Sequence, residues 1–346
     1  MIAAGGTAGH VLPALAVAQA LTERGVHVTF AGSPDRVEAR LVPEAGYELD
    51  PFRITGLPRR PSLALARGVL LAGAAPLACR RILRRRKPDV VFGAGGFVAG
   101  PMLAAAASMR IPRALSEADA HFGLANRLAA PLVDRVFLAY PIDTRFSRNA
   151  TVVGRPVPRS EPVTQLEARE IFELPPEGQV LGVFGALAGA SALNAFAVET
   201  WGASGPAVLH QTGQRDYDEV RRKVTRPDYR VIAETDRFAA ALTACDLVLA
   251  RSGSSVWEIA AAGRPAILVP YPFATGDHQA KNAEHFVRAG GAIMVRELDL
   301  ADVPALVRTL LGDPGRLAQM GQAMLSTARP HAAEEIADGL IALARR

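Results

Sequence analysis

Several features that would place this chain in other classes of protein are scarce or missing. Its 346 residues include two cysteines, Cys79 and Cys245, whose separation fits neither a metal nor a redox motif, so we expect buried thiols of a reduced, cytoplasmic compartment. No uncharged apolar run of about 18 residues and no signal-peptide pattern occur, so any membrane contact is expected to be peripheral. Aromatic residues make up 6% and do not interleave with basic ones, which disfavours nucleic acid as a partner.

Positive charge is concentrated in one stretch of the chain. The formal net charge is +5, and six of the cations stand close together: Arg80, Arg81, Arg84, Arg85, Arg86 and Lys87. An apolar span precedes them and is flanked on its other side by Arg53, Arg59 and Arg60; it includes Leu63, Leu65, Val69, Leu70, Leu71 and Leu77. This pattern favours shallow docking on an anionic membrane surface, where each cation contributes about 1 kcal/mol. The alternative is an ordinary helix with a solvated basic face.

Short β-rich runs, glycine-rich turns and Ala/Leu-rich helices alternate along the chain. This order predicts an α/β protein with two Rossmann-like domains, each a doubly wound parallel sheet, and the length suits two domains of about 100 to 200 residues. A proline-rich passage, 154–162, predicts a hinge between domains 1–155 and 156–330. A last helix, 331–346, can pack back on the first domain. Expected strands include 26–31, 90–92, 133–139, 180–184, 207–211, 246–250 and 266–269.

The first short strand runs into a glycine loop. Residues 5–10, Gly-Gly-Thr-Ala-Gly-His, precede a helix expected from Pro13 through Leu21, and the free N–H groups at such a helix start suit a phosphate or pyrophosphate. A site for NAD or FAD would need Gly-x-Gly-x-x-Gly and an acid ending the second strand. Ala4 replaces the first glycine and the second strand ends in Ala31-Gly32, so a dinucleotide is disfavoured. A purely structural turn is the alternative.

Two further glycine loops follow predicted strands. The loop 93–101 comes after the strand 90–92, and it is expected at the same carboxyl edge as the first loop, where open α/β sheets hold ligands. The loop 185–190 follows the strand 180–184 and lacks side-chain donors. Its backbone N–H groups either contact a phosphate or form a structural turn.

The most informative chemistry lies between residues 251 and 283. Residues 252–255, Ser-Gly-Ser-Ser, open a helix whose N–H groups and hydroxyls can receive a diphosphate. Glu258 can accept two ribose hydroxyls, or it can be a favourable charge near a helix N-terminus worth about 0.3 to 1 kcal/mol. Gln279 can donate to and accept from sugar hydroxyls, with Asp277 and His278 beside it. Alternatively, Asp277 caps the helix that follows.

Three motifs, at 5–16, 95–101 and 251–263, resemble in order and spacing the MurG family of glycosyltransferases, and the last continues through 270–283. The likeness extends over nearly the whole chain. It implies the GT-B fold, with two Rossmann-like domains facing a cleft. It also implies inverting transfer of N-acetylglucosamine from UDP-N-acetylglucosamine to an undecaprenyl-pyrophosphate-linked muramyl peptide, for peptidoglycan synthesis at the cytoplasmic face of the cell membrane.

The resemblance assigns residues to both substrates. The donor-binding residues are Gly185, Ala186, Arg251, Ser252, Gly253, Ser254, Glu258, Asp277, His278 and Gln279. The acceptor-binding residues are Gly6, Thr7, Ala8, Gly9, Gly95, Gly96, Phe97 and Asn126. Inverting transfer needs a base, for which we expect His10, with an ordinary pKa of about 6.5, or alternatively Glu117. Helix N-termini and Arg251 are expected to meet the leaving-group charge, without a metal or another cofactor.

The chain departs from the family pattern in three places. Residues 116–119 read Ser-Glu-Ala-Asp where the family has His-Glu-Gln-Asn, residues 187–188 read Leu-Ala in place of Ser-Gln, and residues 154–158 read Gly-Arg-Pro-Val-Pro in place of Gly-Asn-Pro-Val-Arg. Each lost polar contact costs about 1 to 3 kcal/mol, and more in rate if it acts in the transition state. Two alternatives therefore stay open: a UDP-sugar or polyprenyl-lipid binding homologue that has lost catalysis, and a UDP-sugar epimerase.

Overall fold

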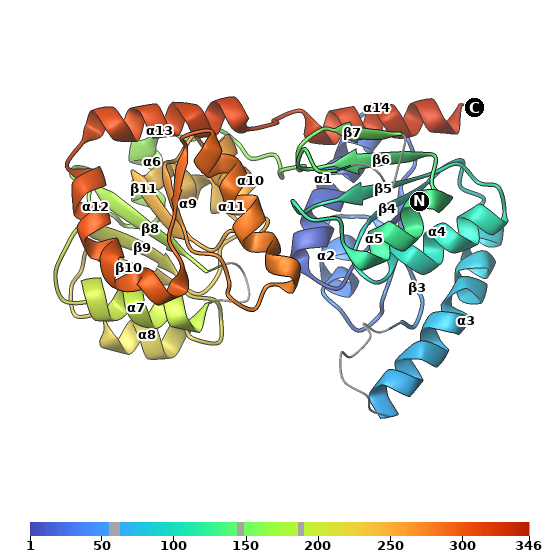
Figure 1. Ribbon diagram of the computed structural model, residues 1–346, viewed down its shortest axis with the longest axis horizontal. Coiled ribbons are helices and arrows are strands. Elements are labelled where there is room, and N and C mark those ends of the chain that lie inside the picture. Colours follow the sequence, from blue (N-terminus) through green and yellow to red (C-terminus); the bar gives the residue numbers. More distant parts are fainter. Residues whose placement is uncertain (55–62, 144–148, 186–189, 346) are drawn as a thin grey trace. The chain divides into compact units, whose positions relative to one another are not determined.

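The computed structural model describes residues 1–54, 63–143, 149–185 and 190–345. These residues form two compact units, one of Met1–Pro158 with Arg329–Arg346 and the other of Arg159–Ala328. Each unit contains one parallel β-sheet with helices on both faces (Figure 1). The α/β class and the two doubly wound parallel sheets are confirmed.

The first unit contains a seven-stranded sheet in the order β3-β2-β1-β4-β5-β6-β7. Its strands are β1 (Ile2–Ala4), β2 (Thr29–Gly32), β3 (Glu48–Pro51), β4 (Val91–Gly95), β5 (Arg113–Glu117), β6 (Arg135–Leu138) and β7 (Ala150–Val152). The strand order reverses between β1 and β4. The loops after these two strands therefore flank the switch point, where open α/β sheets hold ligands.

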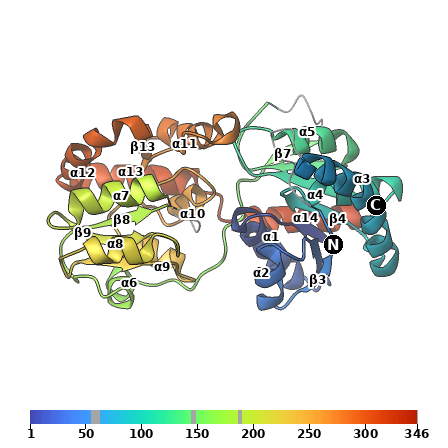
Figure 2. The ribbon, with the colours of Figure 1, turned by 90° about the horizontal axis from the view of Figure 1, so that it is seen from below.

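Helices cover both faces of this sheet. The helices α1 (Ala8–Thr22), α2 (Glu38–Glu44) and α14 (Ala332–Ala344) build one apolar core with it. On the other face lie α3 (Leu63–Arg86), α4 (Ala99–Ser108), α5 (Leu124–Ala129) and the short 3-10 helix η1 (Ala130–Leu132). The helix α14 packs along α1 (Figures 1 and 2). The end of the chain thus completes the core of the first unit.

The second unit contains a six-stranded sheet in the order β10-β9-β8-β11-β12-β13. Its strands are β8 (Val180–Phe184), β9 (Ala207–Gln211), β10 (Tyr229–Ile232), β11 (Leu247–Ala250), β12 (Ala266–Leu268) and β13 (Ala292–Met294). Its helices are α6 (Gln165–Ile171), α7 (Ser191–Trp201), α8 (Tyr217–Lys223), α9 (Phe238–Ala244), α10 (Val256–Ala261), α11 (His278–Arg288), α12 (Val303–Leu311) and α13 (Pro314–Thr327), with 3-10 helices η2 (Thr275–Asp277) and η3 (Glu297–Asp302). Here the order reverses between β8 and β11.

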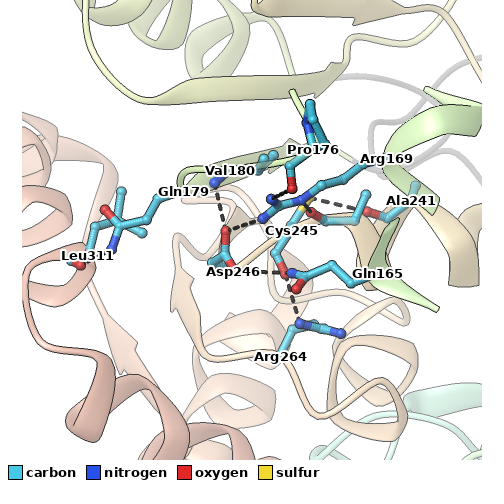
Figure 3. A network of polar contacts seen from close by, with 11 residues as sticks. Gln165, Arg169, Pro176, Gln179, Val180, Ala241, Cys245, Asp246, Arg264 and Leu311 are labelled. Carbon is cyan, nitrogen blue, oxygen red and sulfur yellow. Dashed lines mark hydrogen bonds and ion pairs between the residues drawn. The ribbon is translucent and has the colours of Figure 1, made fainter. Parts of the chain in front are cut away.

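A polar network ties α6 to the amino edge of the second sheet (Figure 3). The Asp246 carboxylate accepts hydrogen bonds from Gln165 Nε2 at 3.0 Å, Arg169 Nη2 at 2.8 Å and the Val180 backbone N–H at 2.7 Å. Arg169 also donates to two backbone carbonyls. Ligands of this fold class bind at the opposite, carboxyl edge, so the network is structural. The neighbouring Cys245 is a free, buried thiol whose pKa burial raises.

A buried carboxylate organises the first glycine loop. Glu38, the first residue of α2, is fully buried, and it accepts hydrogen bonds from the backbone N–H groups of Gly6 at 2.9 Å and Ser33 at 3.0 Å. A Cβ atom at Gly5 would lie 2.2 Å from Glu38 Oε1, and one at Gly32 would lie 2.8 Å from Glu38 Cγ. Glu38, the acid that follows the second strand, therefore binds the protein's own backbone. Its side chain occupies the space that a Cβ atom at Gly5 or Gly32 would need, which explains these two glycines.

We expect Glu38→Ala to lower the free energy of unfolding by about 2 to 3 kcal/mol, because it leaves the buried N–H group of Ser33 and the partly buried N–H group of Gly6 without acceptors. Urea denaturation followed by circular dichroism measures the change. Glu44→Ala is the matched control, since Glu44 is an exposed carboxylate at the other end of α2 that pairs with Arg40. Equal stability of the two variants would contradict the role given to Glu38.

Candidate functional site

The loops after β1 and β4 interlock in the first unit. A Cβ atom at Gly96 would lie 2.0 Å from the carbonyl oxygen of Gly5, and one at Gly6 would lie 2.9 Å from Phe97 Cε1. Both glycines have positive φ, +77° at Gly96 and +91° at Gly6. A side chain at either position would force the loops apart. The structure therefore brings together the Gly6 and Gly96 loops that the sequence assigned to one edge of the sheet.

His10 lies in the first turn of α1, half-buried between these loops. Its Nδ1 atom is 3.1 Å from Thr7 Oγ1, and a Cβ atom at Gly95 would lie 2.5 Å from its Cδ2 atom. Burial, and then the charge of Arg155, lower the pKa of His10 to about 4, against the opposing effect of Asp119. The imidazole is therefore neutral at pH 7, the form in which a histidine can accept a proton.

The start of α1 keeps part of its capacity to bind an anion. The Gly6 N–H is used by Glu38, but in the described part of the chain the N–H groups of Thr7, Ala8 and Gly9 have no hydrogen-bond acceptor. The first N–H groups of a helix have no partner within the helix and are available to an anion. The start of α1 thus offers three backbone donors to an anion.

Glu117 and Asn126 hold the loop after β5. The Glu117 carboxylate accepts from the backbone N–H of Gly123 at 2.9 Å, from Asn126 Nδ2 at 2.9 Å and from the Asp119 N–H at 3.2 Å. Burial raises the pKa of Glu117, and these hydrogen bonds lower it in part. The Asn126 amide also donates to the Ser116 carbonyl at 3.2 Å. Both side chains are engaged with the protein itself, so they shape the loop next to His10.

The serine loop after β11 presents unpaired donors in the second unit. Gly253 and Ser254 are half-buried, and so is Glu258 in the first turn of α10. Ser252 is fully buried, its carbonyl accepts from Asn282 Nδ2 at 3.2 Å, and its hydroxyl has no partner among the described residues. Within the same residues, no acceptor pairs with the backbone N–H groups of 252–255. The loop can therefore hold the oxygens of a diphosphate.

Arg251 is used inside the protein. Its guanidinium forms an ion pair with Glu297 and donates to the carbonyls of Val269 and Pro270, each at 3.3 Å. The side chain is 7% exposed. Its charge is thus compensated, and it braces the loops that follow β12 and β13. The sequence offered no motif that marked Glu297, because its partner lies 46 residues away.

The loop after β12 orients Gln279. Its Oε1 atom accepts from the Tyr271 N–H at 2.9 Å, so its remaining amide hydrogens make it a donor for a ligand. Asp277 has a left-handed backbone, with φ of 53°, and its side chain does not cap α11; it lies 3.4 Å from Arg296. Asp277 is thus the N-cap residue of α11, the position that the capping alternative gave it, but its side chain makes no capping hydrogen bond. His278 is held by the Thr275 carbonyl, 2.9 Å from its Nδ1 atom.

The third glycine loop is described only at its ends. Gly185 is buried, while Ala186, like Leu187 and Ala188, lies outside the described residues.

A polar cluster joins the start of α7 to the residue before α8. The carboxylate of Asp216 accepts from Ser191 Oγ at 2.8 Å and Asn194 Nδ2 at 3.0 Å, and it pairs with Arg215 at 2.8 Å. No sequence motif marked this cluster. Asp216-Tyr217-Asp218 has the Asp-x-Asp spacing, yet the described residues contain no metal-holding group of three or more acidic, histidine or cysteine side chains.

Known proteins match the chain over its length. The glycosyltransferase family 28 N-terminal domain matches residues 1–138, and the family 28 C-terminal domain matches residues 180–336. Two relatives are named UDP-N-acetylglucosamine--N-acetylmuramyl-(pentapeptide) pyrophosphoryl-undecaprenol N-acetylglucosamine transferase. That of Acidithiobacillus ferrooxidans is 42% identical over 99% of this chain and 96% of its own, and that of Salinibacter ruber is 39% identical over 100% and 97%.

A solved structure agrees with these relatives. The crystal structure of Acinetobacter baumannii MurG superposes with a TM-score of 0.78 at 26% identity, covering 99% of this chain and 98% of that one. The family models account for both described units, and the relatives exceed a third in identity from end to end. The chain therefore belongs to the MurG family of glycosyltransferases, within glycosyltransferase family 28.

Proposed function

We propose that this protein transfers N-acetylglucosamine, with inversion, from UDP-N-acetylglucosamine to an undecaprenyl-pyrophosphate-linked muramyl peptide. The first unit holds the acceptor and the second holds the donor. The observation that carries the proposal is the position of the half-buried His10 imidazole between the glycine loops at the first switch point, beside three N–H groups, those of Thr7, Ala8 and Gly9, that have no acceptor among the described residues. This arrangement combines a base that can accept a proton with donors for the pyrophosphate of the lipid-linked substrate. A sugar-nucleotide binding protein without catalysis does not need this combination.

The donor is recognised by the loops after β11 and β12. The N–H groups of 252–255 and the Ser254 hydroxyl bind the diphosphate, and Glu258 accepts hydrogen bonds from the ribose hydroxyls. Gln279 donates its amide hydrogens to an oxygen of the transferred sugar, since its own oxygen is held by Tyr271. In place of a direct contact with UDP, Arg251 and its partner Glu297 keep the loops after β12 and β13 in position.

The reaction then needs one proton transfer from the acceptor. The acceptor hydroxyl oxygen forms a bond to the anomeric carbon, the bond between that carbon and the diphosphate oxygen breaks, and His10 takes the hydroxyl proton. The electron pair of the broken bond leaves with UDP, whose charge the serine-loop donors stabilise. Glu117 shapes the loop next to the base rather than serving as the base, because both of its oxygens already accept hydrogen bonds.

Labelled UDP-N-acetylglucosamine, incubated with and without a lipid-linked muramyl-peptide acceptor, tests the proposal. Transfer of label to the acceptor is expected. Acceptor-independent change of the sugar would indicate an epimerase, and saturable binding without either reaction would indicate a binding homologue. Either of these outcomes would overturn the proposed function.

For His10 we predict an unusual pH dependence. The pKa of His10 in the folded protein is about 4. The imidazole therefore stays neutral when the pH falls below the ordinary histidine pKa of about 6.5, and protonation removes the base only near pH 4. The acid limb of kcat/KM should therefore lie well below pH 6.5. His10→Ala should lower kcat by about 100-fold or more, whereas His27→Ala, at an exposed histidine of the same unit, should not. Undiminished transfer by the His10 variant would remove it as the base.

For Glu258 we predict an effect on donor binding. Glu258→Ala should raise the KM for UDP-N-acetylglucosamine by roughly 10- to 100-fold and leave kcat nearly unchanged, because hydrogen bonds to a charged group contribute about 1.5 to 3 kcal/mol. Initial rates at varied donor concentration measure this. Glu199→Ala, at an exposed position of α7, is the control. A loss confined to kcat would contradict ribose recognition by Glu258.

We also propose peripheral binding to the cytoplasmic face of the cell membrane through α3. Within the described part of the chain, no helix combines the length and apolar character needed to cross a bilayer. The basic cluster is divided: Arg85 and Arg86 pair with Asp50, and Arg86 also pairs with Glu48, whereas Arg81 and Arg84 are exposed. Arg59 and Arg60 and the side chains of Leu63, Leu65, Val69, Leu70 and Leu71 lie outside the described set.

Replacement of the exposed cations should weaken vesicle binding. We expect Arg81→Gln with Arg84→Gln to lower partitioning onto anionic phosphatidylglycerol vesicles by roughly 30-fold at low salt, at about 1 kcal/mol per cation. Co-sedimentation measures it. Arg221→Gln with Arg222→Gln makes the same charge change on α8 and serves as the control. Equal binding by both double variants would exclude this part of α3 as the contact.

A further inference from the structure

A buried arginine from the hinge connects the two loops around His10. Arg155 is 6% exposed. Its Nη1 donates to the carbonyl of Ala118 at 3.1 Å, and its Nη2 donates to the carbonyl of Gly9. Gly9 immediately precedes His10 in α1, and Ala118 follows β5. One guanidinium therefore joins three segments that are distant in the sequence.

The Gly9 carbonyl is open to this contact because of a proline. In an α-helix the carbonyl of residue 9 would accept from the N–H of residue 13, but residue 13 is Pro13, inside α1, and proline has no N–H. An unpaired carbonyl in a half-buried first turn is costly. The Arg155 guanidinium supplies the missing donor, and so it holds the turn that carries His10.

Two side chains of opposite charge act on the imidazole. Arg155, from the hinge, and Asp119, from the loop after β5, shift the pKa of His10 in opposite directions, beyond the lowering caused by burial.

We propose that Arg155 is a positioning residue for His10: it binds the carbonyls of Gly9 and Ala118, and together with Asp119 it forms a compensated pair of charges around the base. The proposal depends on the proposed function only in the use of His10 as the base. The bridging geometry requires a planar group with several donors, which lysine lacks. Charge and geometry can therefore be tested separately.

The experiment compares Arg155→Gln, Arg155→Lys, Asp119→Asn and the Arg155→Gln/Asp119→Asn double variant with Arg40→Gln, an exposed arginine of the same unit, as control. His10 is titrated in the free protein by NMR of the labelled imidazole, a readout that needs no activity. The pKa of His10 should rise in Arg155→Gln and fall in Asp119→Asn. In the double variant it should lie between those of the two single variants.

Transfer assays add the second readout. Arg155→Lys should keep the wild-type titration of His10 but lower kcat by about 10-fold with an unchanged KM for the donor, because its one nitrogen cannot occupy both positions from which Nη1 and Nη2 donate. An unchanged His10 titration in folded Arg155→Gln, or full kcat in Arg155→Lys, would overturn the proposal. If no variant and no wild-type protein transfers sugar, the proposed function fails, while the titration still decides whether Arg155 acts on His10.

Discussion

The first unit depends on the close approach of two loops that a single methyl group would separate. A Cβ atom at Gly96 would overlap the Gly5 carbonyl, and one at Gly95 would overlap the His10 ring. The strands make this approach possible because β1 and β4 are adjacent, with a register shift at Ala4 opposite Gly95. The glycines thus allow contact between the two loops as much as contact with a ligand. The contact between the loops fixes the position of His10.

The central strands were predictable and the edges were not. The bounds of β8 and β9 match the expected runs, since both strands contain consecutive buried apolar residues, although β9 ends in the buried polar residues His210 and Gln211. The edge strands β3 and β7 contain polar or exposed residues, so their sequences resemble loops. The helix expected from Pro13 begins at Ala8, because a proline in the first turns of a helix costs little when a side chain replaces its lost hydrogen bond.

The candidate site was predictable in its loops but not in its supports. Sequence spacing proposed residues 5–10, 95–97 and 252–258 for the site, because glycine and serine after buried strands can present backbone N–H groups to a ligand at the carboxyl edge of a sheet. The partners of these loops, Glu38, Arg155 and Glu297, each come from a separate segment, and single charged residues give no pattern to detect. Several charges that a motif assigns to a substrate, Arg251 above all, are instead satisfied within the protein.

The place of α14 has a consequence for biosynthesis. The core of the first unit includes Ile336, Ala337, Leu340 and Leu343 from the last helix, packed against residues of α1 near the start of the chain. During translation, the second unit, 159–328, has all of its own residues before that helix leaves the ribosome. Most of the first unit is thus synthesised before the second unit, but its core is completed after it. Until α14 packs against α1, the apolar face along α1 needs protection from aggregation, which a chaperone can give.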